Sequence, residues 1–254
     1  MDNQNEPGCY ENRLVAFIDV LGFKNKIESS NPQEIFDVLK YIKAWDSNGS
    51  NKLSMKEILY YASSQDNLST TVGEKYDVKD KMNCTCFSDS IVMSVLVDDS
   101  NEKERFFTLV VILLYMGGKL LLENFPLRGG IALGNIVHTQ NDIVMGPALI
   151  EAYKLEETAN YPRIILSEEL QKKLNIPHSL SSKSQDLFKD YIMEYNDGNY
   201  GFDQLQYFKT IREVELKYVS PKMKYQNEIF AIKNNIEEEL KKNKDNPHVL
   251  IKYI

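Results

Sequence analysis

The sequence predicts an α+β fold in which helices cover one face of a β-sheet. Residues 14–18 (LVAFI) are continuously apolar, which is typical of a central strand buried on both faces. Residues 84–87 and 91–97 have strand composition and flank the polar turn SDS, which predicts a hairpin. Residues 102–123 are long and apolar enough to form a buried core helix. Strands and helices are therefore predicted to alternate around one core.

Local signals place the other elements of the first half. Residues 21–23 (LGF) turn the chain from the first strand into a helix. Pro32 suits the first turn of a helix, and the apolar residues after it recur at intervals of three and four, as on an amphipathic helix: Ile35, Phe36, Leu39 and Ile42. The polar, turn-rich composition of residues 63–81 predicts a flexible insertion.

The second half continues with shorter elements after Pro126, which ends the long helix. We predict, in order, a strand at residues 127–133, a short strand at 143–145, a helix from 146 through 155, a strand at 163–166, a short helix at 169–174 capped by Ser167, and a charged terminal helix at 225–244. The glycines of the strand at residues 127–133 permit close approach of another backbone.

The composition argues against nucleic acid as a partner. The 254 residues include 30 Lys and Arg against 37 Asp and Glu, which gives a net charge of -7. Such a chain lacks the basic excess that binding to a phosphate backbone requires. Its three cysteines show neither a CxxC motif nor the spacing of a disulfide framework, which favours a reducing compartment.

The sequence also argues against a membrane segment. The first 12 residues are polar and contain no apolar stretch of the kind found in a secretory signal. Residues 106–122 are strongly apolar but are interrupted by Thr108 and by Gly117, Gly118 and Lys119. They also fall short of the ~20 residues that a membrane span needs. We therefore expect a cytoplasmic protein without membrane association.

The sequence lacks the common nucleotide and zinc motifs. Leu113 and Leu120 occupy the positions at which a Walker loop ending at Gly118 and Lys119 requires Gly and Ser or Thr. Residues 128–134 (RGGIALG) space their glycines wrongly for a Rossmann fingerprint. The three histidines include no pair four residues apart, which excludes the HExxH type of zinc site.

Two aspartates stand out as candidate functional residues. Asp19 follows the apolar run VAFI, where an ionised carboxylate is costly unless it is hydrogen-bonded, paired or bound to a metal. Asp89 lies in the turn between the two strands of the predicted hairpin. If these strands neighbour the first strand, both carboxylates can converge on one or two hard cations such as Mg²⁺ or Mn²⁺. The alternatives are a helix cap for Asp19 and an ordinary hairpin aspartate for Asp89.

Four segments together resemble a known enzyme family. VAFIDVLGF, FSDSIVMS, LRGGIALG and DIVMGPALIEAYKLE follow one another in the order and approximate spacing of the class III nucleotide cyclase catalytic domain. The chain most resembles the pyrimidine nucleotide cyclases of the bacterial Pycsar antiphage system. The resemblance implies a ferredoxin-like sheet covered by helices, with a catalytic domain at residues 13–175. It further implies a C-terminal extension at residues 176–254 that completes the sheet and ends in a helix.

The resemblance also implies roles for individual residues. Asp19 and Asp89 match the two metal ligands, which would bind two Mn²⁺ or Mg²⁺ ions per site. Arg128 matches an arginine on the phosphate side. Lys154 stands where related cyclases carry a transition-state arginine from the partner subunit of a homodimer with composite sites. The backbone around the metals and the triphosphate would come from Val20, Leu21, Gly22 and Phe23. The alternatives are a surface salt bridge for Arg128 and a solvated helix position for Lys154.

The base-reading positions depart from those of purine cyclases. Thr85 stands where adenylate cyclases have Lys and guanylate cyclases have Glu. Ile150 replaces an Asn near the ribose, and Ile143, with Asp142 one residue off, falls at the second purine-reading position. These departures favour a pyrimidine substrate or a loss of activity. The resemblance to the Pycsar cyclases, in which uridylate cyclases are the commoner members, implies conversion of UTP to 3',5'-cyclic UMP and pyrophosphate, as a second messenger for a separate effector in antiphage defence. The alternatives are a cytidylate cyclase that makes cyclic CMP from CTP, and a catalytically inactive cyclase-like module that binds a nucleotide or a protein.

Overall fold

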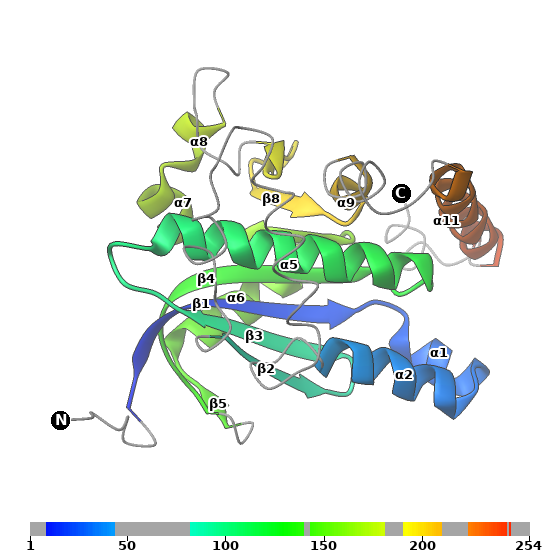
Figure 1. The fold of residues 1–254 in the computed structure, drawn as a ribbon, viewed down its shortest axis with the longest axis horizontal. Helices are drawn as coiled ribbons and strands as arrows, with labels where there is room; N and C mark the ends of the chain where they lie inside the picture. The colour runs from blue at the N-terminus through cyan, green and yellow to red at the C-terminus, as the bar shows by residue number, and fades with distance from the viewer. Residues whose placement is uncertain are drawn as a thin grey trace.

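A computed structural model describes residues 9–43, 82–139, 143–180, 190–209, 223–242 and 244. The described strands form one sheet in the order β2-β3-β1-β4-β6-β8-β7, with β5 paired to β4 (Figure 1). The strands are β1 (Glu11–Val20), β2 (Met82–Phe87), β3 (Ser90–Leu96), β4 (Leu127–His138), β5 (Val144–Met145), β6 (Arg163–Leu166), β7 (Met193–Glu194) and β8 (Tyr200–Asp203).

Helices connect the strands and cover the sheet. They are α1 (Phe23–Ser29), α2 (Pro32–Lys43), α5 (Glu102–Leu122), α6 (Pro147–Thr158), α7 (Glu168–Leu174), α8 (Ile176–Ser179), α9 (Leu205–Lys209) and α11 (Met223–Lys242). Strand β1 is antiparallel to both of its neighbours, β3 and β4, whereas β4 and β6 are parallel. This mixed sheet with helices confirms the predicted α+β class.

Strand β1 lies at the centre of the core, as its apolar run predicts. Leu14, Val15, Ala16 and Ile18 are all buried. Because side chains alternate across a strand, Leu14 and Ile18 join one hydrophobic cluster and Val15 joins another on the opposite face. The strand is therefore buried on both faces, which explains why its sequence does not alternate between apolar and polar residues.

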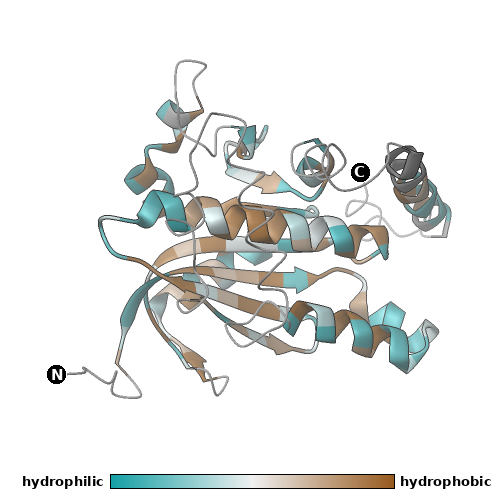
Figure 2. Ribbon diagram, viewed as in Figure 1, coloured by the Kyte–Doolittle hydropathy of each residue, from teal (hydrophilic) through white to brown (hydrophobic). Residues whose placement is uncertain are grey.

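Helix α5 covers one face of the sheet and is the long core helix predicted from the sequence. It contacts β3 and β4 on one side, and α9 and α11 on the other. Figure 2 shows hydrophobic residues concentrated along α5 and the neighbouring strands. The helix has the length and composition of a membrane span, but 78% of its most apolar stretch is buried inside the domain. Its apolar character comes from packing on two sides.

Helix α6 covers part of the opposite face, whereas the sequence pattern predicted one helix-covered face. We call this surface of the sheet the α6 face. The buried residues of α6, Ala148, Ala152 and Glu156, recur every four residues and form a narrow stripe toward the sheet. A Cβ atom on Gly130 would lie 2.3 Å from Leu155 Cβ and 2.6 Å from the Ala152 carbonyl oxygen. The close backbone approach predicted for the glycines of β4 is thus used to seat α6.

Several boundaries differ from the sequence-based prediction. Strand β4 continues beyond the predicted end at residue 133 to His138, because it pairs with the first residues of β1 and then with β5. Strands β7 and β8 extend the sheet beyond β6. The local sequence pattern after Pro177 is too loose to locate these strands, whereas the family resemblance implied that residues 176–254 complete the sheet. The predicted insertion at residues 63–81 lies outside the described residues. The division at residue 175 into a domain and an extension stays a prediction.

Candidate functional site

Asp19 lies near the end of β1, with its side chain on the α6 face. It pairs in register with Ser90 on β3 and with Arg128 on β4. Its side chain is 22% exposed, so the carboxylate is partly removed from water at the edge of the apolar strand. A charge in this position is costly without partners, which is the condition that singled out Asp19 in the sequence.

Asp89 lies in the turn between β2 and β3, directly beside the end of β1. The Val20 amide donates a hydrogen bond to the Asp89 carbonyl oxygen at 2.9 Å. Ser88 has a φ of 56°, in the left-handed region, which closes the turn tightly. Strands β1 and β3 are therefore neighbours, as the metal-site hypothesis required. Asp19 and Asp89 lie at the same end of this strand pair.

The segment after β1 supplies part of the predicted phosphate-side backbone. Gly22 has a φ of 75° and precedes α1, where a residue with a side chain would be strained. The Leu21 amide donates to the Pro126 carbonyl oxygen at 2.8 Å. That amide is thus engaged in the fold, and the role of the Leu21 backbone at the triphosphate stays a prediction. Phe23 is buried at the start of α1.

Arg128 lies opposite Asp19 and links it to a carboxylate that the sequence analysis missed. One terminal nitrogen of its guanidinium is 3.5 Å from an Asp19 carboxylate oxygen and also forms an ion pair with Glu156 on α6. Glu156 is only 4% exposed. A signal for it exists in the sequence, because Glu156 continues the four-residue spacing of Ala148 and Ala152 on the buried side of α6.

The electrostatics of this cluster are dominated by carboxylates. Burial raises the pKa of Glu156, and the nearby Asp19 carboxylate raises it further, whereas Arg128 opposes both effects. The Arg128 guanidinium thus forms ion pairs with two carboxylates, and Asp89 lies at the same end of the sheet. A cation from solution would relieve the repulsion that remains between these carboxylates.

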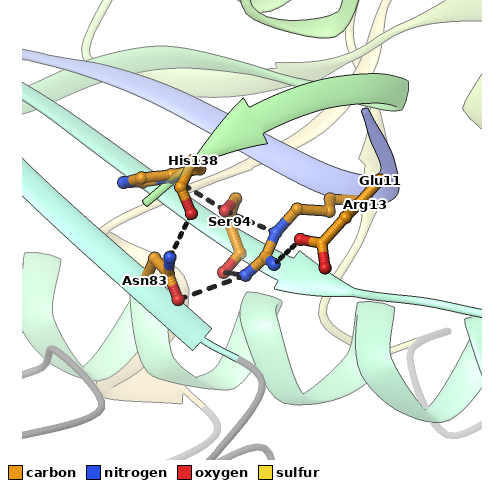
Figure 3. A network of polar contacts seen from close by, with 5 residues as sticks. All are labelled: Glu11, Arg13, Asn83, Ser94 and His138. Carbon is orange, nitrogen blue, oxygen red and sulfur yellow. Dashed lines mark hydrogen bonds and ion pairs between the residues drawn. The ribbon is translucent and has the colours of Figure 1, made fainter. Parts of the chain in front are cut away.

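Thr85 lies on β2, and its hydroxyl oxygen is 3.0 Å from Nε2 of His138 at the end of β4. His138 belongs to a polar network on the α6 face that also contains Glu11, Arg13, Asn83 and Ser94, which we call the His138 network (Figure 3). This network is not predictable from local sequence patterns, since its members lie on four strands that only the fold brings together.

The remaining predicted residues that the structure describes lie toward solvent. Lys154 is exposed on α6, and no described residue forms an ion pair with it. Ile150 on α6 and Ile143 before β5 are both more than half exposed. Asp142 lies outside the described residues. Lys154 is thus separate from the cluster around Asp19 within one chain.

A cavity of about 670 Å³ is lined by neither Asp19 nor Asp89. Its lining includes Arg163, which forms an ion pair with Asp197, and Gln204, which donates a hydrogen bond to the Leu127 carbonyl. None of the predicted site residues is among the described residues that line it. These polar groups have structural partners, and the cavity adds nothing to the predicted site.

The donor set at the end of β1 and β3 fits a hard divalent cation. Asp19 and Asp89 provide carboxylate oxygens, the ligand type that Mg²⁺ and Mn²⁺ prefer. Within the described residues no group of three or more His, Cys, Asp or Glu side chains could hold a metal by itself. At phosphate-transfer sites Mg²⁺ is usually bound by one or two carboxylates, and water and phosphate oxygens fill its remaining positions.

Comparison with known proteins finds similarity to solved structures only. No protein-family model matches the chain, and no curated protein matches it. The adenylyl cyclase CyaB from P. aeruginosa matches with a TM-score of 0.42 and 15% sequence identity, over 76% of this chain and 93% of that chain.

Two guanylyl cyclase structures match to a similar extent. The monomeric guanylyl cyclase domain of the RhoGC fusion protein from the aquatic fungus Blastocladiella emersonii has a TM-score of 0.43 and 14% identity, over 76% of this chain and 95% of that chain. The catalytic core of a rhodopsin-guanylyl cyclase with converted specificity, in complex with ATPαS, has a TM-score of 0.42 and 14% identity, over 76% of this chain and 97% of that chain. Because these scores and identities are low, the similarity assigns neither activity nor substrate to this chain.

Proposed function

We propose that this chain is a nucleotide cyclase that converts UTP to 3',5'-cyclic UMP and pyrophosphate. The observation that carries the proposal is the position of two carboxylates, Asp19 and Asp89, at the same end of neighbouring strands, with Arg128 opposite Asp19. This arrangement suits a triphosphate bound with divalent cations. The four sequence motifs that resemble class III nucleotide cyclases include all three residues.

Under this proposal Asp19 and Asp89 hold two Mn²⁺ or Mg²⁺ ions. When bound, such ions supply charge neutralisation and lower the pKa of a coordinated hydroxyl. The residues that surround the aspartates favour this role, because Arg128 is shared between Asp19 and Glu156 and neutralises only part of their charge. Glu156 holds the Arg128 guanidinium between β4 and α6, so that it stays beside Asp19.

The reaction is an intramolecular displacement at phosphorus. The ribose 3'-hydroxyl loses its proton to water and its oxygen attacks the α-phosphorus in line, and the bond to the departing pyrophosphate breaks. Arg128 interacts with the phosphate oxygens as their charge redistributes, and Lys154 of the partner subunit does so from the opposite side. Thr85 lies on β2, which β3 separates from β1 in the sheet, and contacts the base edge.

The proposal includes a homodimer with two composite sites. Lys154 is exposed on α6 and would meet the carboxylates of a second copy across the α6 face. Large apolar side chains exposed on or beside this face support an interface there: Phe87, Ile143, Met145, Ile150 and Tyr153. The cyclic nucleotide would act as a second messenger on a separate effector, as the resemblance to Pycsar cyclases implies.

The main alternative is an inactive cyclase-like module that binds a nucleotide or a protein. The substitutions at Ile150 and Lys154 favour this alternative, whereas the presence of both aspartates and of Arg128 favours catalysis. Only catalysis predicts that nucleotide is consumed.

The test is incubation of the purified full chain with ATP, GTP, CTP or UTP and Mn²⁺, followed by mass detection of cyclic mononucleotides and pyrophosphate. Cyclic UMP as the main product is the expected result. Nucleotide binding without any cyclic product would identify the inactive module and overturn the proposed activity. Efficient formation of cyclic AMP would keep the cyclase assignment but overturn pyrimidine specificity.

A further inference from the structure

The cavity of about 670 Å³ is lined by residues from the ends of α5 and β8 and from α11. Helix α11 packs against α5 in this part of the molecule (Figure 1). Most of the cavity wall is apolar and includes Leu121 at the end of α5, Pro126 before β4, Pro162 before β6 and Ile236 on α11. A cavity of this size with a mostly apolar wall and a few polar groups is typical of a site for a small molecule.

Arg163 and Asp197, two of the three charged residues that the described lining contains, neutralise each other. Both terminal nitrogens of Arg163 donate to the Asp197 carboxylate, and its Nε donates to the Ala159 carbonyl oxygen at 2.8 Å. The Arg163 side chain is 4% exposed, and its guanidinium lies 4.7 Å from the centre of the Tyr195 ring. An anionic ligand would therefore meet no accessible cation among the described residues of the lining.

Asp203, at the end of β8, is the third charged residue of the described lining. Its Oδ1 accepts hydrogen bonds from the backbone amides of Leu205 at 2.8 Å and Gln206 at 3.3 Å. Its Oδ2 forms no hydrogen bond or ion pair with any described residue. Burial raises the pKa of Asp203, although the two amides and Lys209 oppose this effect.

The carboxylate of Asp203 is thus a partly desolvated charge beside an apolar cavity. Lys209 is exposed on α9 and is not among the described residues that line the cavity. A cation inside the cavity would offset the cost of burying the carboxylate, because the attraction between opposite charges is stronger away from water. The role of Asp203 as the cap of α9 accounts for Oδ1 alone.

We propose that this cavity binds a small apolar molecule that carries a protonated amine, and that the amine donates a hydrogen bond to Oδ2 of Asp203. The apolar wall takes the body of the molecule, and Asp203 provides the one carboxylate oxygen that is available to its charged end. A charge-assisted hydrogen bond of this kind is stronger than one between neutral groups. The proposal is independent of the proposed cyclase activity, because none of the residues around Asp19 takes part in it.

Three indole compounds test the chemistry of the ligand. Tryptamine, tryptophol and indole-3-propionate share the indole ring and a two-carbon chain, but end in an amine, a hydroxyl and a carboxylate. At about pH 7 the amine is protonated and the carboxylate is ionised. Their dissociation constants can be measured by calorimetry on the full chain without nucleotide or metal. We expect tryptamine to bind at least ~10-fold more tightly than either of the other two compounds.

Variants test whether the binding occurs in this cavity. Asp203→Asn keeps the cap of α9, since Asn caps helices as well as Asp does, but removes the charge. It should weaken tryptamine binding at least ~10-fold, to the level of tryptophol. The matched control is Asp99→Asn, which removes the charge of an exposed aspartate and should leave binding unchanged. Ile236→Trp fills the cavity from α11 and should weaken the binding of all three compounds.

Thermal unfolding without ligand checks that each variant is folded. Equal affinity for the three compounds, tighter binding of indole-3-propionate, or binding of none of them would overturn the proposal. So would unchanged tryptamine binding to folded Asp203→Asn or Ile236→Trp, because the amine would then bind other carboxylates of the chain. Formation of cyclic UMP by a chain that binds none of the three compounds would support the cyclase activity and refute the cavity as an amine site.

Discussion

Asp19 and Arg128 face each other across the antiparallel pair β1 and β4, with a guanidinium nitrogen 3.5 Å from a carboxylate oxygen. The same nitrogen forms an ion pair with Glu156, which reaches the sheet from α6. Asp89 completes the group at the end of the neighbouring strand. Three carboxylates and one guanidinium are thus held by β1, β4, α6 and the turn before β3, so that removal of one member changes the charge that the others experience.

The first prediction concerns the two aspartates. Asp19→Ala and Asp89→Ala should each lower turnover by at least ~10²-fold, because each removes a charge that the triphosphate site requires. Turnover is measured as cyclic UMP formed per chain, and thermal unfolding checks that the variants remain folded. Asp99→Ala removes an exposed aspartate near the start of α5 and should keep full activity. Wild-type activity of either site variant would contradict the cyclase proposal.

The second prediction concerns assembly. An Asp19→Ala chain and a Lys154→Ala chain should both be inactive alone, but mixed dimers should rebuild one complete site. In an equal mixture half of the dimers are mixed and one of their two sites is intact, so about a quarter of the wild-type activity should return. Differently tagged chains allow the mixed dimer to be isolated and assayed. An inactive mixed dimer would exclude Lys154 from the site.

The third prediction concerns Glu156 and pH. Its pKa in the folded chain is raised above the ordinary value of 4.5, chiefly by burial. Its protonated form therefore contributes stability that is fully present below pH 4.5 and is lost as pH rises through the raised pKa. Relative to Glu156→Gln, which cannot ionise, the wild type should lose stability as pH rises from the ordinary carboxyl pKa of 4.5 through the raised pKa of Glu156.

Urea unfolding of both chains across this range measures the difference. As pH rises, the unfolding free energy of the wild type should fall relative to that of the glutamine variant. A constant gap would mean that Glu156 ionises equally easily in the folded and unfolded chains, which would contradict the effect of its burial.

The fourth prediction concerns the contact between α6 and the sheet. A Cβ atom introduced by Gly130→Ala would lie 2.3 Å from Leu155 Cβ and 2.6 Å from the Ala152 carbonyl oxygen. The helix must move outward, which should cost about 1–3 kcal/mol of unfolding free energy. Because the shift also moves Glu156 relative to Arg128, turnover should fall together with stability. Denaturant unfolding and the cyclase assay are the measurements, and unchanged stability would show that α6 is not seated on Gly130.

Much of the fold is encoded in local sequence patterns. The apolar run of β1 predicts a strand buried on both faces, and α5 is predicted from its length and apolar content. The positions of Asp19 after an apolar strand and of Asp89 in a hairpin turn are likewise local features. They can be recognised without coordinates because burial of a charge and closure of a turn depend on a few consecutive residues.

Other features depend on contacts between residues far apart in the chain, and only the tertiary structure decides them. Arg13 reaches Ser94 across 81 positions, and Thr85 reaches His138 across 53. Strand β4 extends to His138 because β1 and β5 pair with it, and not because its own sequence requires a strand there. Which atom donates and which accepts in the His138 network follows from which side chains the folded sheet brings together, because a hydroxyl or an imidazole takes its direction from its neighbours.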